Sequence, residues 1–128
     1  MLELDHLAVA ARTLDEGRAY VERALGLRVQ PGGRHGRYGT HNLLAGLEDG
    51  LYLEVIAIDP QAVRPRDPRW FRLDEFSGAP CLHNWICRTG DMAAHLSKVF
   101  TDTRVAFIPA QQPKMTARFN IDGQVRWL

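Results

Sequence analysis

His6 and Glu54 are the side chains whose type and setting point most directly to chemistry. Alternation along residues 51–58 places Glu54 on one strand face with Tyr52. A carboxylate in such an apolar strand is costly to bury unless it is paired, hydrogen-bonded or bound to a metal. An imidazole and a carboxylate that face one cavity are ligand types suited to zinc, iron, manganese or nickel. Alternation alone leaves open a second interpretation, a buried hydrogen-bonded histidine and a glutamate held by an arginine.

A second candidate site is the glycine-rich, polar segment 32–42. Its glycines allow tight turns and positive φ angles. Its polar side chains could approach an anionic or carbonyl-bearing ligand, and they are Arg34, His35, His41 and Asn42. It is not a phosphate loop, because no Gly-Lys-Ser/Thr follows and it precedes a strand rather than a helix. The alternative is a flexible hairpin loop whose charges are incidental.

The elements that must position these residues follow from periodicity. Residues 13–16 have the form of a capping box and begin a helix that Gly26 ends. Residues 31–39 are predicted to be a loop, and residues 59–80, with four of the seven prolines, a connector without regular structure. The predicted strands of this half are 3–11, 27–30, 40–45 and 51–58.

The second half restarts the same pattern. It predicts a strand at 82–88 and a helix at 91–100, followed by weaker strands at 104–108, 115–120 and 124–128. Aligning the two helices sets His6 against Asn84, which indicates a tandem repeat of one supersecondary unit. Two such units can form a sheet curved around a shared cavity.

Bulk properties limit the possible partners and location. A chain of 128 residues has room for one domain, and a net charge of +1 gives no reason to expect nucleic acid or an anionic membrane as a partner. The first residues include acids and lack the apolar run of a secretory signal, so we expect no such signal. No window has the roughly 20 apolar residues that cross a bilayer. Cys81 and Cys87 lie too far apart in one strand to pair, so we expect both to be reduced and buried in a cytoplasmic protein.

Blocks of sequence that span nearly the whole chain resemble, in order and spacing, the glyoxalase-like family of the vicinal oxygen chelate superfamily. The resemblance implies an α+β domain over 1–128. In it, paired β-α-β-β-β modules (1–60 and a short 81–128, joined by 61–80) form a cup-shaped curved sheet with helices outside. In that superfamily the cup commonly holds a divalent metal that chelates vicinal oxygens of a ligand. The blocks are Leu4–Leu7, Gly32–Asn42, Tyr52–Pro60, Trp70-Phe71, Asn84-Trp85, Arg118, Asp122-Gly123 and Arg126-Trp127.

The same resemblance assigns roles to residues. It implies that His6 and Glu54 are metal ligands and that Glu54 is also catalytic. Asn84 stands where metal-dependent relatives commonly have a histidine, so we do not expect a complete four-ligand site in one chain. The family pattern also continues beyond Trp127, which predicts a short variant or a fragment. The implied substrate-binding residues are Arg34, His35, His41, Asn42, Tyr52, Asn84 and Arg118.

The expected function is binding of a small oxygen-rich organic molecule in the cup, with metal-assisted lyase, isomerase or dioxygenase chemistry. Whether the protein is an enzyme stays open at this point, because some members of the superfamily bind antibiotics without a metal. The alternative is therefore a metal-free protein that binds or sequesters its ligand, as bleomycin-resistance proteins do. We also expect a homodimer, because a short second module leaves a sheet edge for a second copy to cover.

Overall fold

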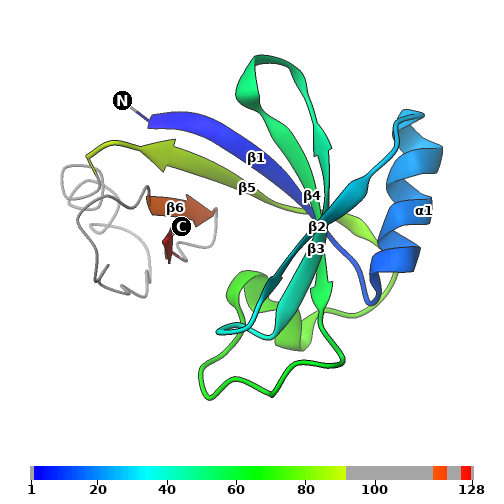
Figure 1. Cartoon of the computed structure of the whole chain (residues 1–128), viewed down its shortest axis with the longest axis vertical. Helices are drawn as coiled ribbons and strands as arrows, with labels where there is room; N and C mark the ends of the chain where they lie inside the picture. The colour runs from blue at the N-terminus through cyan, green and yellow to red at the C-terminus, as the bar shows by residue number, and fades with distance from the viewer. Residues whose placement is uncertain (1, 92–116, 121–124, 128) are drawn as a thin grey trace.

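The computed structural model describes residues 2–91, 117–120 and 125–127, and these form an α+β fold around one curved sheet (Figure 1). The strands of this part lie in the order β2-β3-β4-β1-β5-β6-β7. The expected fold class is confirmed. The strands are β1 (Leu2–Ala10), β2 (Gln30–His35), β3 (Thr40–Gly46), β4 (Tyr52–Ile58), β5 (Cys81–Thr89), β6 (Ala117–Asn120) and β7 (Val125–Trp127).

The helix α1 (Leu14–Leu25) begins and ends where the sequence predicts. Thr13 Oγ1 accepts a hydrogen bond from the Glu16 N–H at 3.2 Å, and Gly26 ends the helix with a φ of 65°. The capping box is only half formed. The Glu16 carboxylate accepts from Arg12 Nη2 at 2.8 Å and from Arg12 Nε at 3.1 Å, so it serves as the partner of Arg12.

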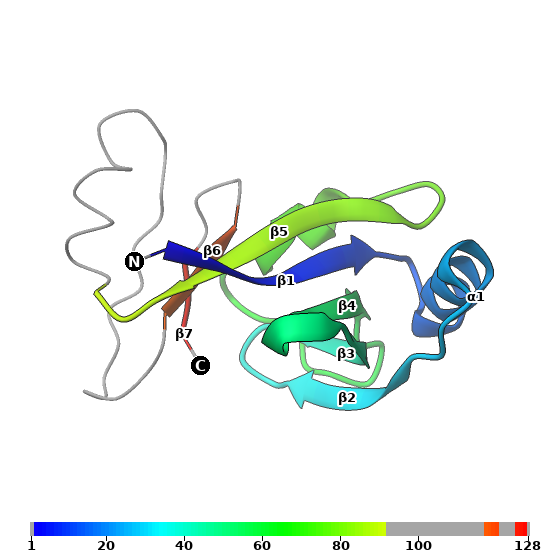
Figure 2. The same ribbon diagram turned by 90° about the horizontal axis from the view of Figure 1, so that it is seen from above.

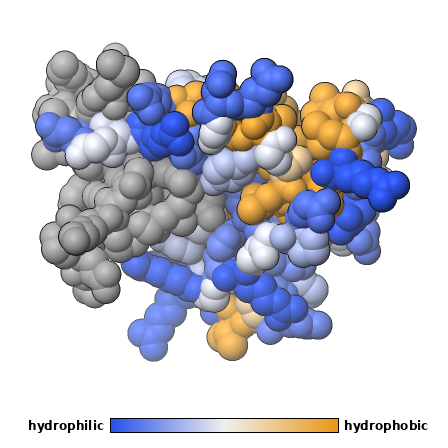
Figure 3. Space-filling model, turned by 45° about the horizontal axis from the view of Figure 1, so that its top comes forward, coloured by the Kyte–Doolittle hydropathy of each residue, from blue (hydrophilic) through white to orange (hydrophobic). Residues whose placement is uncertain are grey.

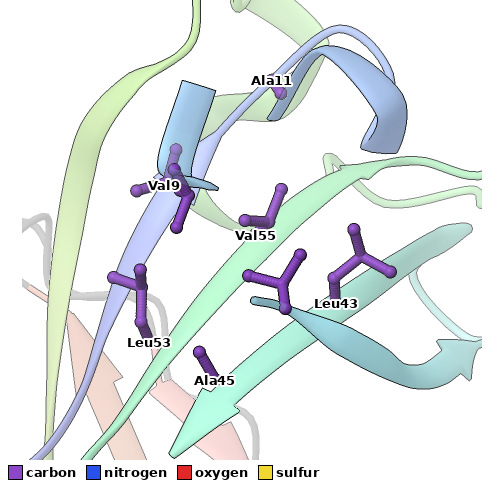
Figure 4. Close-up of a cluster of buried hydrophobic side chains, with 8 residues drawn as sticks. Val9, Ala11, Leu43, Ala45, Leu53 and Val55 are labelled. Carbon is purple, nitrogen blue, oxygen red and sulfur yellow. The ribbon is translucent and has the colours of Figure 1, made fainter. Parts of the chain in front are cut away.

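A hydrophobic core lies between α1 and one face of the sheet. Val9, Leu43, Leu53 and Val55 are all less than 5 % exposed and lie together on this face (Figure 4). They form one cluster with Val21 of the helix. These strand residues alternate with His6, Glu54 and the other residues of the opposite face, as period-two structure requires. The core therefore fixes which way the candidate site faces.

The opposite face of the sheet is covered by the 3₁₀ segment η2 (Trp70–Glu75), where the sequence predicts no regular structure. Trp70 and Phe71 pack with Ile56 and Ile86 on that face. His83 Nε2 donates to the Phe71 carbonyl at 2.7 Å. The proline-rich connector therefore contains a short packed segment, because burying apolar side chains against the sheet is more favourable than leaving them in water.

η2 is closed by Arg69 and Asp74. The Arg69 N–H donates to Asp74 Oδ2 at 2.7 Å, and its buried guanidinium pairs with the same carboxylate. These contacts hold a turn in which Phe71 and Arg72 have φ angles of 56° and 51°. The pairing explains how a segment with two left-handed residues stays ordered.

The glycine-rich segment is also more regular than predicted. The predicted strand at 27–30 was wrong except for its last residue: β2 begins at Gln30 and runs through His35, within the predicted loop. It pairs with β3 with an irregularity between Pro31 and Arg34. β2 lies at the end of the described strand order, and a proline is tolerated in such a strand because part of its backbone has no strand to pair with. Pairing with β3 supplies hydrogen bonds that alternation of side chains does not reveal.

β1 and β5 run side by side and antiparallel at the centre of the molecule (Figure 2). His6 pairs with Ile86, and Ala8 pairs with Asn84. If the two halves are repeats in which His6 corresponds to Asn84 and Ala8 to Ile86, each of these pairs is the repeat-equivalent of the other. The register thus agrees with the alignment of His6 and Asn84 expected from sequence.

The two halves differ on the outer sides of these central strands. β1 has β4 as a parallel neighbour, whereas β5 has β6 as an antiparallel neighbour. β6 and β7 fall within the weak strands predicted at 115–120 and 124–128. The predicted strand at 104–108, and the predicted helix at 91–100 apart from Asp91, lie outside the described residues.

Candidate functional site

A β-bulge in β1 brings Asp5 and His6 together. Leu4 pairs with Cys87 and His6 with Ile86, so Asp5 is the extra residue in the ladder. Successive strand residues otherwise point to opposite faces, and a bulge re-aims one of them. The Asp5 Oδ2 and His6 Nδ1 atoms lie 2.7 Å apart, and both residues are fully buried.

Glu54 reaches the other nitrogen of the same imidazole. β4 is parallel to β1, with Glu54 opposite Ala8, and the Glu54 side chain is 1 % exposed. Glu54 Oε2 lies 3.2 Å from His6 Nε2, yet His6 Nε2 makes no hydrogen bond within the described part of the chain. The distance suits a hydrogen bond but the direction does not, because an N–H in the ring plane must point at its acceptor.

Asn42 holds the second oxygen of Glu54. Asn42 Nδ2 donates to Glu54 Oε1 at 2.6 Å, and the Gly33 N–H donates to Asn42 Oδ1 at 2.7 Å. The second bond fixes which end of the amide faces Glu54. Gly32 is needed for this arrangement, because a Cβ at that position would lie 2.1 Å from Asn42 Oδ1.

His35 stands behind Asn42. Its Nε2 lies 3.4 Å from Asn42 Nδ2, its Nδ1 lies 2.9 Å from Thr40 Oγ1, and its ring meets the Trp70 ring edge-on. The glycine-rich segment therefore does join the candidate site. It does so through Asn42 and His35, which support Glu54 from behind.

Tyr52 and Asn84 lie on the same face as His6. The Tyr52 ring is half-buried and stacks on the His6 ring, with centroids 4.4 Å apart and planes 13° apart. Asn84 is buried and pairs with Ala8. Of the buried group, Tyr52 is the member that solvent reaches.

Three predicted ligand-binding residues are not brought to this group. Arg34 Nη2 donates to Gln61 Oε1 at 2.7 Å, and its exposed side chain turns outward. His41 follows the opposite parity from Asn42 in β3, so it faces the α1 side. Arg118 lies opposite Arg88 in β6, and its side chain is outside the described residues.

Sequence reasoning missed Asp5 and Arg88. Alternation places Asp5 on the face away from His6, and only the bulge reverses this. Arg88 Nη1 lies 3.7 Å from Asp5 Oδ1, and Arg88 Nε donates to Glu3 Oε2 at 3.2 Å. An aspartate directly before a candidate histidine ligand, with an arginine in the neighbouring strand, was the signal available.

The charges at the site are mainly negative. Two buried carboxylates, Asp5 and Glu54, flank one imidazole, and Arg88 approaches only the first. The pKa of the nearby Cys87 thiol is raised, chiefly by burial and secondly by the negative charge of Asp5. Cys81 is exposed rather than buried as expected, and both thiols are free. Within the described ranges, no three or more His, Cys, Asp or Glu residues form a group that could hold a metal.

An open hollow of about 650 Å³ lies along β1 and β5. Leu7 and Trp85 face each other in it, and Leu7 packs against the core on the α1 side. His6 points the opposite way, whereas Asn84 of the candidate site also lines this hollow.

Comparison with known proteins shows the family of the sequence and a likeness of the fold. The sequence matches the glyoxalase-like domain family over residues 4–128. No curated protein sequence matches it. The fold is similar to the crystal structure of methylmalonyl-CoA epimerase from Mycobacterium tuberculosis, with a TM-score of 0.62 and 17% identity over 96% of this chain and 83% of that chain. In the described part of the chain, no helix has the length and apolar character that crossing a membrane requires.

Proposed function

The chain belongs to the glyoxalase-like domain family, and from this premise we propose that it binds a small oxygen-rich organic molecule at a divalent cation held by His6 and Glu54. One observation carries the proposal. Among the residues that the structure describes, the buried His6 Nε2 atom has no hydrogen-bond partner, and Glu54 Oε2 lies 3.2 Å away. A buried nitrogen and a carboxylate oxygen in such contact need a shared positive charge.

The separation of these atoms fits two ligands of one cation. Ligand bonds of about 2.0–2.2 Å at angles between about 90° and 109° place neighbouring ligand atoms about 2.8–3.6 Å apart. The distance between His6 Nε2 and Glu54 Oε2 is 3.2 Å. Imidazole with carboxylate suits zinc, manganese, iron or nickel. A protonated imidazole would instead direct its N–H along the ring plane, where Glu54 does not lie.

The remaining residues of the site have separate tasks in this proposal. A bound cation would act as a Lewis acid and polarise an oxygen of the organic ligand. Asn42 donates to Glu54 Oε1, and Oε2 is the oxygen that lies beside His6 Nε2, where it would bind the cation or take a proton. Tyr52, half-buried over His6, would contact the apolar part of the ligand. Of the reaction classes expected, this arrangement favours isomerase or lyase chemistry, in which a carboxylate moves a proton.

Metal analysis tests the proposal. The metal content of protein purified without chelators would be measured, and the stripped protein titrated with zinc and manganese by calorimetry. We expect one ion per chain and at least a tenfold loss of affinity in His6→Gln and Glu54→Gln. His41→Gln is the matched control, because His41 lies on the opposite face of the sheet. Absence of binding to the unmodified protein would refute the cation site and favour metal-free sequestration.

We further propose a cytoplasmic homodimer. The free thiols of Cys81 and Cys87 suit a reducing compartment. The described strand order ends at β7, and an end strand offers backbone groups that a second copy can pair with.

A further inference from the structure

We infer that Asp5 is a positioning residue, which holds His6 in the tautomer that leaves a lone pair, and not a proton, on the Nε2 atom beside Glu54. The inference deepens the proposed function and rests on it, because the lone pair matters when a cation lies between the two side chains. Asp5 is not among the site residues predicted from the sequence.

The tautomer follows from the chemistry of the contact. A neutral imidazole carries one proton, and a carboxylate can only accept. Asp5 Oδ2 lies 2.7 Å from His6 Nδ1, so the proton is on Nδ1 and the Nε2 atom is left with its lone pair. This is the atom that makes no hydrogen bond and lies 3.2 Å from Glu54 Oε2. A histidine that ligates through one nitrogen and donates to a carboxylate through the other is a recurring arrangement at metal sites.

Asp5 is itself held in place. The bulge in β1 turns its side chain toward His6, and the carboxylate is 2 % exposed. Arg88 Nη1 lies 3.7 Å from Asp5 Oδ1 and supplies a compensating charge. Arg88 also donates to Glu3, which is half exposed. A line of contacts thus runs from Glu3 through Arg88 and Asp5 to His6.

Loss of the Asp5 carboxylate releases the choice of tautomer. An asparagine keeps the shape, but its NH₂ group can donate to His6 Nδ1, and the proton then moves to Nε2. An N–H in that position occupies the place of the cation. Replacing an outer partner of a ligand histidine typically lowers metal affinity about 10- to 100-fold.

The experiment combines a spectroscopic and a binding measurement on the full chain. Nitrogen-15 NMR of the histidine rings in the metal-free protein, with His6 assigned from His6→Gln, reports which nitrogen carries the proton. Zinc titration by calorimetry runs in parallel on the unmodified protein, on Asp5→Asn and on Glu3→Gln. Glu3→Gln is the matched control, because Glu3 contacts the same Arg88 but not His6.

We expect His6 to be protonated on Nδ1 alone in the unmodified protein and in Glu3→Gln. Asp5→Asn should show protonation on Nε2 and about a 10- to 100-fold loss of zinc affinity. The inference is overturned if His6 in the unmodified protein carries a proton on Nε2, a result that stands even if Asp5→Asn fails to fold. Unchanged tautomer and affinity in a folded Asp5→Asn protein also overturn it. An Nδ1-protonated His6 in a protein that binds no zinc would refute the proposed function while leaving Asp5 as the residue that sets the tautomer.

Discussion

At the scale of single residues, the contact between His6 Nε2 and Glu54 Oε2 governs the site. Both side chains are at most 1 % exposed, so water does not screen one from the other. Each neighbouring residue then has a definable part: Asp5 sets the proton on the imidazole, and Asn42 occupies the far oxygen of the carboxylate. In this account the cation lies between the two atoms that these contacts leave facing each other, His6 Nε2 and Glu54 Oε2.

Asn42→Ala tests the support of Glu54. The change removes a donor to Glu54 Oε1, in a buried contact, and an acceptor for the Gly33 N–H, in a part-buried one. We expect a loss of about 1–3 kcal/mol in the free energy of unfolding, measured by urea denaturation, together with weaker zinc binding. Arg34→Ala should change both quantities less, because the Arg34 side chain is 64% exposed and its contact with the Asp59 carboxylate is a loose one of 3.6 Å. Equal stability of the two variants would contradict the role of Asn42 in supporting Glu54.

At the scale of elements, the hairpin of β2 and β3 carries the orientation of Glu54. Gly32→Ala places a Cβ 2.1 Å from Asn42 Oδ1, so Asn42 must move away from Glu54. We expect about 1–3 kcal/mol of destabilisation, measured by urea denaturation, as for other overpacked positions. Gly33→Ala is the matched control one residue along, where a Cβ would meet nothing within 4 Å. Indistinguishable behaviour of the two alanine variants would contradict the role of the close approach at Gly32.

The 3₁₀ segment η2 makes a prediction about pH. The pKa of Asp74 lies below its ordinary value of 3.8, chiefly because the Arg69 backbone N–H donates to it, with the Arg69 charge adding to the effect. Because its pKa is lowered in the folded state, the Asp74 carboxylate stabilises the protein above pH 3.8. This stabilisation is lost as the pH falls through the folded-state pKa. We expect Asp74→Asn to cost about 1 kcal/mol near neutral pH, measured by urea denaturation.

That cost should disappear when the pH falls well below 3.8, since both proteins then carry an uncharged side chain at this position. Glu75→Gln is the control, because Glu75 pairs with Arg72 in an exposed contact that contributes little. A difference between Asp74→Asn and the unmodified protein that does not vary with pH would contradict this account.

Elements with strong local signals were predictable from the sequence. The capping residue Thr13 and the terminal Gly26 define α1, and alternation defines β1 and β4 and hence the shared face of His6 and Glu54. The bulge at Asp5 and the extension of β2 were not predictable, because both depend on which strand lies alongside. The packing of η2 depends likewise on a sheet face that local sequence does not display.

At the scale of the whole molecule, the two halves meet at β1 and β5 but differ in what lies beside them. Hydrophobic residues also reach the surface of the described part, in patches between hydrophilic ones (Figure 3). Leu82 and Trp85 of β5 are 61% and 43% exposed. Surface of this kind, together with an end strand, is a setting in which a second copy of the chain can bind.

The proposed homodimer predicts a mass of two chains in sedimentation velocity at micromolar concentration, since each chain has a mass of 14.5 kDa. Replacing Val125 in β7 by proline should shift the equilibrium toward the monomer if that strand pairs across the interface. A cooperatively unfolding monomer over the whole concentration range would mean that one chain closes its own sheet.

The central claim is that a divalent cation lies between His6 and Glu54, and a crystal structure with manganese or zinc tests it most directly. Anomalous scattering recorded at the absorption edge of the metal identifies the ion independently of the protein. We predict one peak about 2.0–2.2 Å from both His6 Nε2 and Glu54 Oε2, with Asp5 Oδ2 still accepting from His6 Nδ1. A map without a peak there, in which the His6 Nε2 N–H donates directly to Glu54, would show that the pair is a buried salt bridge and would contradict the account.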